Sequence, residues 1–213
     1  MNLSLRPPIL AALLLAAAAS CEGRRAPSAG AVEAGGASAA REYPNPRPKP
    51  EFVLTDTEGQ PFAFREGTEG SATLLFFGYT YCPDVCPVHM ANIAAALHKL
   101  PDAVARQVKV VFVTTDPERD TPERLRAWLE QFDRGFIGLT GTQAEVDSAQ
   151  TSMRLPPAYR EPGDSAGQYF IGHSAHVIAF TRDGLARYAL PFGTRQSEWA
   201  QEIPRLVAYP DKP

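Results

Sequence analysis

Hydrophobic residues fall into short continuous runs that alternate with segments of helical periodicity. Two runs, Ala72 to Phe77 and Val108 to Thr114, are apolar at most positions, which is typical of strands covered on both faces of a sheet. Between them, from Pro87 to Pro101, apolar residues recur at helical spacing. This order predicts a strand, a helix and a second strand in one sheet.

Further predicted elements continue the alternation on both sides of this unit. They are a strand at Phe52 to Leu54, a turn and a small apolar group up to Phe64, a helix capped by Thr121-Pro122, a strand at Phe136 to Leu139, a helix at Gln143 to Met153, an exposed loop at Pro156 to Gly172, a hairpin of Ala175 to Thr181 and Leu185 to Leu190, and a helix at Gln196 to Val207. The sequence therefore predicts an α/β fold whose central mixed sheet is flanked by helices on both faces.

The first twenty residues carry the pattern of an export signal. Arg6 precedes the apolar stretch Ile9 to Ala19, and small residues lead directly into Cys21. The stretch is typical of a signal peptide over residues 1–20, and the place of Cys21 resembles a bacterial lipoprotein signal, in which that cysteine is lipidated. A plain signal peptide with Cys21 as a bystander is the alternative, because Ala18 stands where such signals usually have leucine. The lipoprotein interpretation predicts an anchor at the periplasmic face of a bacterial cell membrane.

Residues 21–50 are predicted to be a tether. Glu22 to Ala40 is rich in Ala, Gly and Ser, and Pro44 to Pro50 has proline at every second position. The first part cannot bury a core, and the prolines hold the second part extended. We therefore expect a flexible, proline-rich, lipid-anchored tether followed by one domain at residues 51–213.

Composition and charge exclude several function classes. The chain of 213 residues is 44% hydrophobic, has a formal net charge of −3 and has no block of Lys and Arg. Nucleic-acid binding needs clustered cations that face phosphates, so we expect no nucleic-acid partner. No apolar run is long enough for an unaided transmembrane helix, and three cysteines are too few for a disulfide-rich mini-fold.

Two cysteines stand between the first predicted buried strand and the helix that follows. Pro87 fits the first helical turn, which puts Cys86 at the cap, where the helix dipole favours the thiolate and Asp84 opposes that effect. Cys82 and Cys86 can close a disulfide or bind one metal ion together. The polar, proline-rich surroundings argue against an inert buried pair, and a structural disulfide across so short a loop would stabilise the fold only weakly. The pair therefore indicates a functional site.

The four histidines differ in what they offer this pair. His98 is late in the predicted helix, and we expect it on the solvated surface. His89 lies three residues after the second cysteine, where it could chelate a metal or be a solvated helix position. His173 and His176 bracket the start of a strand, so at most one faces the cysteine loop if both lie on regular strand. His173 follows Gly172, which allows close approach of another segment.

Three separated motifs resemble one protein family. Phe77 to Pro87 is similar to the copper-loop signature of the Sco (SenC) copper chaperones of cytochrome c oxidase assembly. Thr115 to Glu123 resembles that family's second block, and Ile171 to Ser174 its histidine block. The motifs occur in the family's order, and the resemblance covers about Phe52 to Val207. It implies a thioredoxin-like fold.

The resemblance also implies the chemistry of the site. Cys82, Cys86 and His173 would bind copper, because two soft thiolates and an imidazole suit Cu(I), and Cu(II) can add a further oxygen or nitrogen donor. The protein would pass the ion to the CuA site of cytochrome c oxidase subunit II by ligand exchange, with another periplasmic copper chaperone as a further partner. It would then be a metallochaperone, not an enzyme that turns over a substrate.

Two positions depart from the family pattern. Gly172 stands where the family usually has Asp, which could weaken control of His173, and Tyr81 stands where it often has His, which removes a nitrogen donor near the loop. In the second block, Thr121 is expected to cap a helix. A role for Asp116 near the metal loop or a partner is suggested by the family alone.

Other functions are open to the same dithiol. A thiol–disulfide oxidoreductase would use Cys82 and Cys86 to reduce cysteines of an oxidase subunit or of another chaperone, without a histidine ligand. A structural zinc site would need a fourth ligand, which only His89 or Asp84 could supply nearby in the sequence. A peroxidase lacks a recognisable Thr/Arg arrangement around the first cysteine, and fold alone does not assign function.

Overall fold

The computed structural model describes residues 39–163, 165 and 167–209. The predicted signal peptide, the predicted lipidation site Cys21 and the first part of the predicted tether lie outside these residues. Across the described ranges, no helix is both long enough and apolar enough to cross a bilayer.

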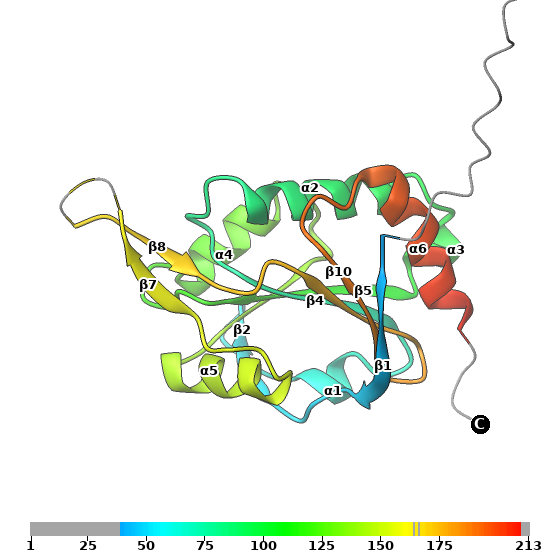
Figure 1. Ribbon diagram of the computed structural model, residues 1–213, viewed down its shortest axis with the longest axis horizontal. Coiled ribbons are helices and arrows are strands. Elements are labelled where there is room, and N and C mark those ends of the chain that lie inside the picture. Colours follow the sequence, from blue (N-terminus) through cyan, green and yellow to red (C-terminus); the bar gives the residue numbers. More distant parts are fainter. Residues whose placement is uncertain (1–38, 164, 166, 210–213) are drawn as a thin grey trace, which may run out of the picture. The chain divides into compact units, whose positions relative to one another are not determined.

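Within the described residues, an eight-stranded sheet forms the centre of the domain (Figure 1). Its strands are β1 (Arg41–Pro48), β2 (Val53–Asp56), β3 (Pro61–Ala63), β4 (Ala72–Gly78), β5 (Val108–Thr114), β6 (Ile137–Thr140), β9 (Val177–Phe180) and β10 (Leu185–Leu190), and β7 (Tyr159–Pro162) and β8 (Tyr169–Gly172) form a separate hairpin. The spatial order is β1-β10-β9-β4-β5-β6-β2-β3. Strands β4, β5 and β6 are parallel and the other neighbours are antiparallel, so the sheet is mixed, as predicted.

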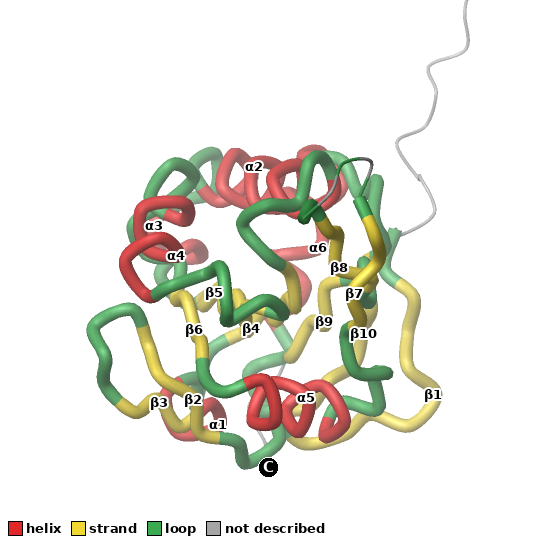
Figure 2. Tube along the Cα trace, turned by 90° about the vertical axis from the view of Figure 1, so that its left-hand side faces the viewer, coloured by secondary structure: helices red, strands yellow, loops and turns green. Residues whose placement is uncertain are grey.

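Helices cover both faces of the sheet. They are α1 (Phe64–Gly67), α2 (Val85–Leu97), α3 (Asp102–Ala105), α4 (Pro122–Leu129), α5 (Gln143–Ser152) and α6 (Gln196–Ala208). Figure 2 shows α2, α3, α4 and α6 on one side of the sheet and α1 and α5 on the other. The predicted helix starts at Thr121-Pro122 and Gln143 are confirmed, because Thr121 and Thr142 cap α4 and α5 with their side chains.

The side chains of β4 alternate between two hydrophobic cores. Leu74 and Phe76 pack in the core under α2, α4 and α6, whereas Leu75 and Phe77 pack in the core under α1 and α5. All four are fully or almost fully buried. Covered faces on both sides explain why the run is apolar at successive positions. The end of β4, at Gly78, is therefore held firmly from both sides.

Strand β1 lies where the sequence predicts part of a free tether. Arg41–Pro48 pairs antiparallel with β10 at the edge of the sheet, with an irregularity between Glu42 and Arg47. Proline has no backbone N–H to donate to a neighbouring strand. An edge strand needs hydrogen bonds on one side only, and the residues between the prolines can supply them. The segment is extended, as predicted, but it is packed against the domain.

The hairpin of β7 and β8 replaces a predicted loop. Tyr159 pairs with Gly172 and Pro162 with Tyr169 in an antiparallel register. Most of the hairpin is exposed, so its residues show no alternation between apolar and polar positions. Its Pro, Gly and polar residues therefore gave the signal of a loop.

Candidate metal centre

The two cysteines lie directly after β4, at the carboxyl end of the parallel centre of the sheet. The chain passes from Gly78 through residues 79–81 to Cys82 and then into α2. A Cβ at position 78 would lie 2.9 Å from the Cys86 Sγ, so only glycine lets this sulfur approach the strand end. Ligands of open α/β sheets bind outside the carboxyl ends of the strands, and the cysteines occupy that edge.

Helix α2 begins earlier than the sequence predicts. Asp84 is the N-cap, and its carboxylate accepts a hydrogen bond from the Val85 amide at 2.6 Å. The prediction that Cys86 caps the helix is therefore wrong, because a carboxylate is a better cap than a thiol. Cys86 instead lies buried in the first turn of α2, still close to the positive end of the helix dipole.

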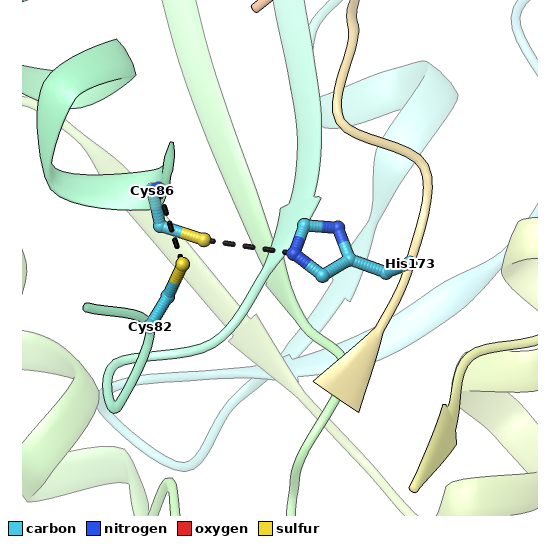
Figure 3. Close-up of side chains that lie close together, drawn as sticks. All are labelled: Cys82, Cys86 and His173. Carbon is cyan, nitrogen blue, oxygen red and sulfur yellow. Dashed lines mark hydrogen bonds between the residues drawn. The ribbon is translucent and has the colours of Figure 1, made fainter. Parts of the chain in front are cut away.

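Cys82, Cys86 and His173 lie together although they are far apart in the sequence. Their ligand atoms all lie within 4.8 Å of one another. The His173 Nε2 is 3.7 Å from the Cys86 Sγ, and the Cys86 amide donates to the Cys82 Sγ at 3.4 Å (Figure 3). Both cysteines are free, with Cys82 half-buried and Cys86 buried. Ligands about 2.0–2.3 Å from one ion lie at most about 4.6 Å apart, so little movement would let all three share an ion.

His173 presents one nitrogen to the sulfurs. Its ring lies edge-on to the rings of Phe76 and Tyr79, each at a centroid distance of 5.8 Å. The Nδ1 atom is 3.0 Å from the carbonyl oxygen of Ser174. Because a carbonyl only accepts, this geometry places a proton on Nδ1, and Nε2 is the ring nitrogen that faces the sulfurs. A ring held through Nδ1 in this way presents Nε2 in the orientation in which a histidine can ligate a metal ion.

The surroundings make the two thiols unequal. The hydrogen bond from the Cys86 thiol, with smaller contributions from His173 and backbone amides, lowers the pKa of Cys82 to about 4. Burial, followed by the neighbouring Cys82 sulfur, raises the pKa of Cys86 well above its ordinary value. Cys82 is thus the thiolate near neutral pH, and Cys86 is the thiol that donates to it.

Two of the other histidines lie where the sequence analysis allows. His176 points away from the cysteines, with its Nε2 3.5 Å from the Tyr43 hydroxyl on β1. One of the pair His173 and His176 therefore faces the cysteine loop; both lie in the connection between β8 and β9, so the condition of the prediction, that both lie on regular strand, is not met. His98 is on the surface, as predicted, where its Nε2 lies 2.8 Å from an Asp133 carboxylate oxygen.

The position of His89 contradicts both sequence-based interpretations, that it chelates a metal and that it is a solvated helix position. It is 1% exposed, so it is not a solvated helix position, and it does not belong to the cluster of ligand atoms. Its Nε2 lies 3.0 Å from the Ala175 carbonyl oxygen, and its ring contacts Phe76 and Phe192. This carbonyl comes from a segment 86 positions away, so spacing along α2 could not reveal the partner.

Asp120 fixes the segment before Cys82, and sequence reasoning missed it. Its carboxylate accepts hydrogen bonds from the Thr80 amide at 2.9 Å and the Thr80 hydroxyl at 2.6 Å. The hydroxyl of Thr114 adds a third at 2.7 Å. Asp120 is fully buried, and this burial raises its pKa. The available signal was its place in the second motif, which the sequence analysis linked to a helix cap and to Asp116.

Asp116 is buried but does not reach the cysteines. Its carboxylate pairs with Arg119 and accepts a hydrogen bond from the Tyr169 hydroxyl at 3.0 Å. Thr121 caps α4 through its hydroxyl, as predicted. The second motif therefore combines a cap with buried contacts to the strand that leads to the histidine.

The two departures from the family pattern have structural partners. At Gly172, a Cβ would collide with the ring of Tyr159, so the glycine admits the close approach that the sequence predicts. Tyr81 is 46% exposed, and its ring lies against the guanidinium groups of Arg119 and Arg124.

Comparison with known proteins identifies the family of the chain. The SCO1/SenC family model matches residues 40–208. A candidate copper-binding protein of Stutzerimonas stutzeri is 36% identical over 146 residues, which cover 68% of this chain and 69% of that protein. The matched region covers only 31 to 48% of the mitochondrial SCO proteins of Arabidopsis thaliana, Danio rerio and Saccharomyces cerevisiae.

Solved structures share the fold over most of the domain. Copper-bound ScoI of Bradyrhizobium japonicum is 34% identical with a TM-score of 0.64, and the match covers 76% of this chain and 98% of that chain. Apo Sco1 of Thermus thermophilus is 27% identical with a TM-score of 0.71, and the match covers 80% and 98%. The chain therefore belongs to the SCO1/SenC family, and its domain has a thioredoxin-like α/β fold.

Proposed function

We propose that the domain binds one copper ion, as Cu(I), through the Cys82 and Cys86 sulfurs and the His173 Nε2. The convergence of these three atoms within 4.8 Å is the observation that carries the proposal. Two thiolates and one imidazole are soft and borderline ligands that suit Cu(I). Within the described ranges, neither His89 nor Asp84 joins the cluster, so a closed four-ligand zinc site has no fourth residue. The copper-bound ScoI relative supports the choice of metal.

Copper in this proposal is cargo. The half-buried Cys82 and His173 give an incoming ligand access to the ion, while the buried Cys86 retains it during exchange. We infer that the acceptor is the CuA site of cytochrome c oxidase subunit II, with another periplasmic copper chaperone as a further partner. Family membership supports this inference, because a relative with the same fold, BsSco, is described as one of the cytochrome c oxidase assembly proteins.

X-ray absorption on the reduced, copper-loaded protein tests the ligand set. We expect two sulfur neighbours and one nitrogen neighbour for each copper ion. The nitrogen should disappear in His173→Ala and persist in the matched control His176→Ala, because His176 lies outside the cluster. Retention of the nitrogen in His173→Ala would reject the proposed site.

Transfer is tested separately with a soluble CuA domain lacking copper. Mixing it with the loaded protein should produce the visible absorption of the assembled CuA site, and His176→Ala should transfer as well as the wild type. No transfer from a fully loaded wild-type protein would leave copper binding intact and reject the proposed acceptor.

The anchor is a further part of the proposal. Lipidation at Cys21 would hold the domain at the periplasmic face of the cell membrane. In cells, the wild-type protein should fractionate with membranes, and Cys21→Ala should fractionate with the soluble periplasm. Equal fractionation of both proteins would reject lipidation at this residue.

A thiol–disulfide oxidoreductase is the second candidate, favoured by the inequality of the two thiols. The Cys82 thiolate would attack a partner disulfide, and the departing partner sulfur would take a proton. Cys86 would then lose its proton and displace the second partner sulfur, leaving a Cys82–Cys86 disulfide and a partner dithiol. His173→Ala should keep this reductase activity, whereas either cysteine variant should lose it, as counted by new thiols on an oxidised CuA domain.

A further inference from the structure

Arg119 contacts both halves of the proposed metal site. Arg119 belongs to the connection between β5 and α4, and its side chain is 22% exposed. The guanidinium carbon lies 3.6 Å from the ring centroid of Tyr169 and 4.7 Å from that of Tyr81. Tyr81 directly precedes Cys82, and Tyr169 begins the strand that ends just before His173. One side chain therefore lies between the segment that carries a sulfur and the segment that carries the imidazole.

Polar contacts fix the guanidinium in this place. Its Nη1 donates to the Tyr169 carbonyl oxygen at 3.1 Å, and its Nε donates to the Asp116 carboxylate. The same carboxylate accepts the Tyr169 hydroxyl. A planar guanidinium group can donate both hydrogen bonds in its plane and still stack its two faces on aromatic rings. Arg119 is thus held to Tyr169, on the segment that leads to His173, by hydrogen bonds, and it contacts Tyr81 by stacking.

Two neighbouring arginines each contact only one of these two segments. Arg124 stacks on Tyr81 at 3.8 Å and donates to the Thr80 hydroxyl at 2.7 Å, both on the cysteine side. Arg160 stacks on Tyr169 at 4.6 Å and pairs with Glu118, on the histidine side. Arg119 occupies the centre of this stack.

The strand before His173 needs such a contact. Strand β8 pairs with β7 in a two-stranded sheet and is not hydrogen-bonded to the eight-stranded sheet that ends at the cysteines. The eight-stranded sheet holds the segment bearing His173 only from Val177 onward, through β9, so on the side of β8 side chains must contribute to the position of His173 relative to the sulfurs. The hydroxyl of Tyr79, which interacts with the Ile171 backbone, is one such contact.

We propose that Arg119 is a positioning residue that keeps the connection bearing His173 in register with the loop bearing Cys82. The inference rests on the proposed function, because it gives Arg119 a part in presenting the imidazole to an ion held by the two sulfurs. Without Arg119, the two sulfurs keep their positions after β4 and in the first turn of α2. The imidazole of His173 is then no longer held at a fixed position relative to them.

Amide hydrogen exchange of the reduced, metal-free protein tests this coupling without copper. Arg119→Gln should speed exchange about fivefold or more in both segments 79–86 and 169–177, because each loses a contact. Arg124→Gln should act on the first segment alone and Arg160→Gln on the second alone. Unchanged exchange in either segment of Arg119→Gln, or faster exchange across the whole sheet, overturns the proposal.

The copper-loaded variants give the second readout. By X-ray absorption, Arg119→Gln should keep two sulfur neighbours and lose at least half of its nitrogen neighbour, whereas Arg124→Gln and Arg160→Gln should match the wild type. A full nitrogen neighbour in Arg119→Gln overturns the proposal. If Arg119→Gln does not fold, the same measurements apply to Arg119→Lys, which keeps the charge and loses the planar fork.

The two proposals fail in different ways. If the wild-type protein does not bind copper through these residues, the proposed function fails, and the exchange experiment still decides whether Arg119 couples the two segments. If copper is bound by all three ligands in both the wild type and Arg119→Gln, only the role of Arg119 fails.

Discussion

Strand β4 has a buried polar cluster near each of its ends, and the two clusters differ in how fully their donors and acceptors are used. Near the start, Lys49 is 2% exposed. Its ammonium group donates to the carbonyl oxygens of Thr68 and Ser71 and to the hydroxyl of Thr73, at 2.6, 3.2 and 2.9 Å. An ammonium group has three donors, so all are used. At the other end, the ligand atoms of Cys82, Cys86 and His173 lie within 4.8 Å of one another, and the Cys86 amide and thiol donate to the Cys82 sulfur.

This difference separates a structural cluster from a functional one more clearly than burial does. Buried polar groups are normally satisfied by protein partners, as Lys49 is. Atoms that converge on one point and are not all used by such partners have capacity left for a ligand. The next four predictions test whether the two ends of β4 can be changed independently.

Replacement of a sulfur ligand should have the largest effect. Cys86→Ser should weaken Cu(I) binding by more than the roughly 10–100-fold typical of losing a group that only orients a ligand. Competition against a Cu(I) chelator measures this change. Lys49→Met is the control, and its Cu(I) affinity should equal that of the wild type. A comparable loss in the control would show that the two ends are not independent.

Removal of the amine at Lys49 should change stability and leave copper binding intact. Lys49→Met removes three hydrogen bonds donated by a buried ammonium group, which should lower the free energy of unfolding by about 1–3 kcal/mol. Urea unfolding of the metal-free protein measures it. Lys109→Met is the matched control, because the half-buried Lys109 amine donates to Gly67 and should matter less. Equal decreases in the free energy of unfolding of the two variants would contradict the idea that the three hydrogen bonds of the Lys49 ammonium group matter for stability.

Acidification should act on the cysteine end first. The folded-state pKa of Cys82 is lowered to about 4 from 9.0, so its thiolate contributes stability that is fully present above pH 9 and is lost as the pH falls towards 4. The difference in unfolding free energy between the wild type and Cys82→Ser, with thiols kept reduced, should shrink over that range. Thiolate absorbance near 240 nm should show one group with a midpoint near pH 4. A midpoint near 9 would contradict the lowered pKa.

Alkaline pH should act on the lysine end. Burial lowers the pKa of Lys49 to about 8 from 10.5, so the unfolded chain binds more protons between these values. Stability should therefore rise with pH from about 8 to about 10.5 relative to Lys49→Met. Paired urea titrations at pH 8 and pH 10 measure this difference. A difference that is constant or falls with pH would contradict the lowered pKa.

The elements that the sequence predicted are those whose local pattern reports their surroundings. Strands β4 and β5 are covered on both faces, so their runs are continuously apolar, and Thr121 and Thr142 supply local caps for α4 and α5. Strand β1 and the β7–β8 hairpin escaped recognition because prolines and exposed polar residues leave no alternation. Strand β1 pairs with β10, which is distant in the sequence, and the hairpin consists mostly of exposed polar residues. A local hydrophobic pattern reports neither feature.

The candidate site divides in the same way. The cysteine pair and His173 could be proposed from motifs, and the structure brings their ligand atoms together. The burial of His89 and the contacts of Asp120 could not be predicted, because their partners lie 86 and 40 positions away. The cap of α2 was placed two residues too late, because Pro87 suggested a later start than Asp84 gives.

The long separation between Cys86 and His173, 87 positions, gives an ion at this site a second consequence. By joining the two ends of so large a loop it would act as a reversible cross-link, and a covalent link across a loop of that length stabilises a fold by about 4–5 kcal/mol in the simplest account. A full carrier would then be stiffer than an empty one around the connection from β8 to β9. Release of the ion would relax that connection again.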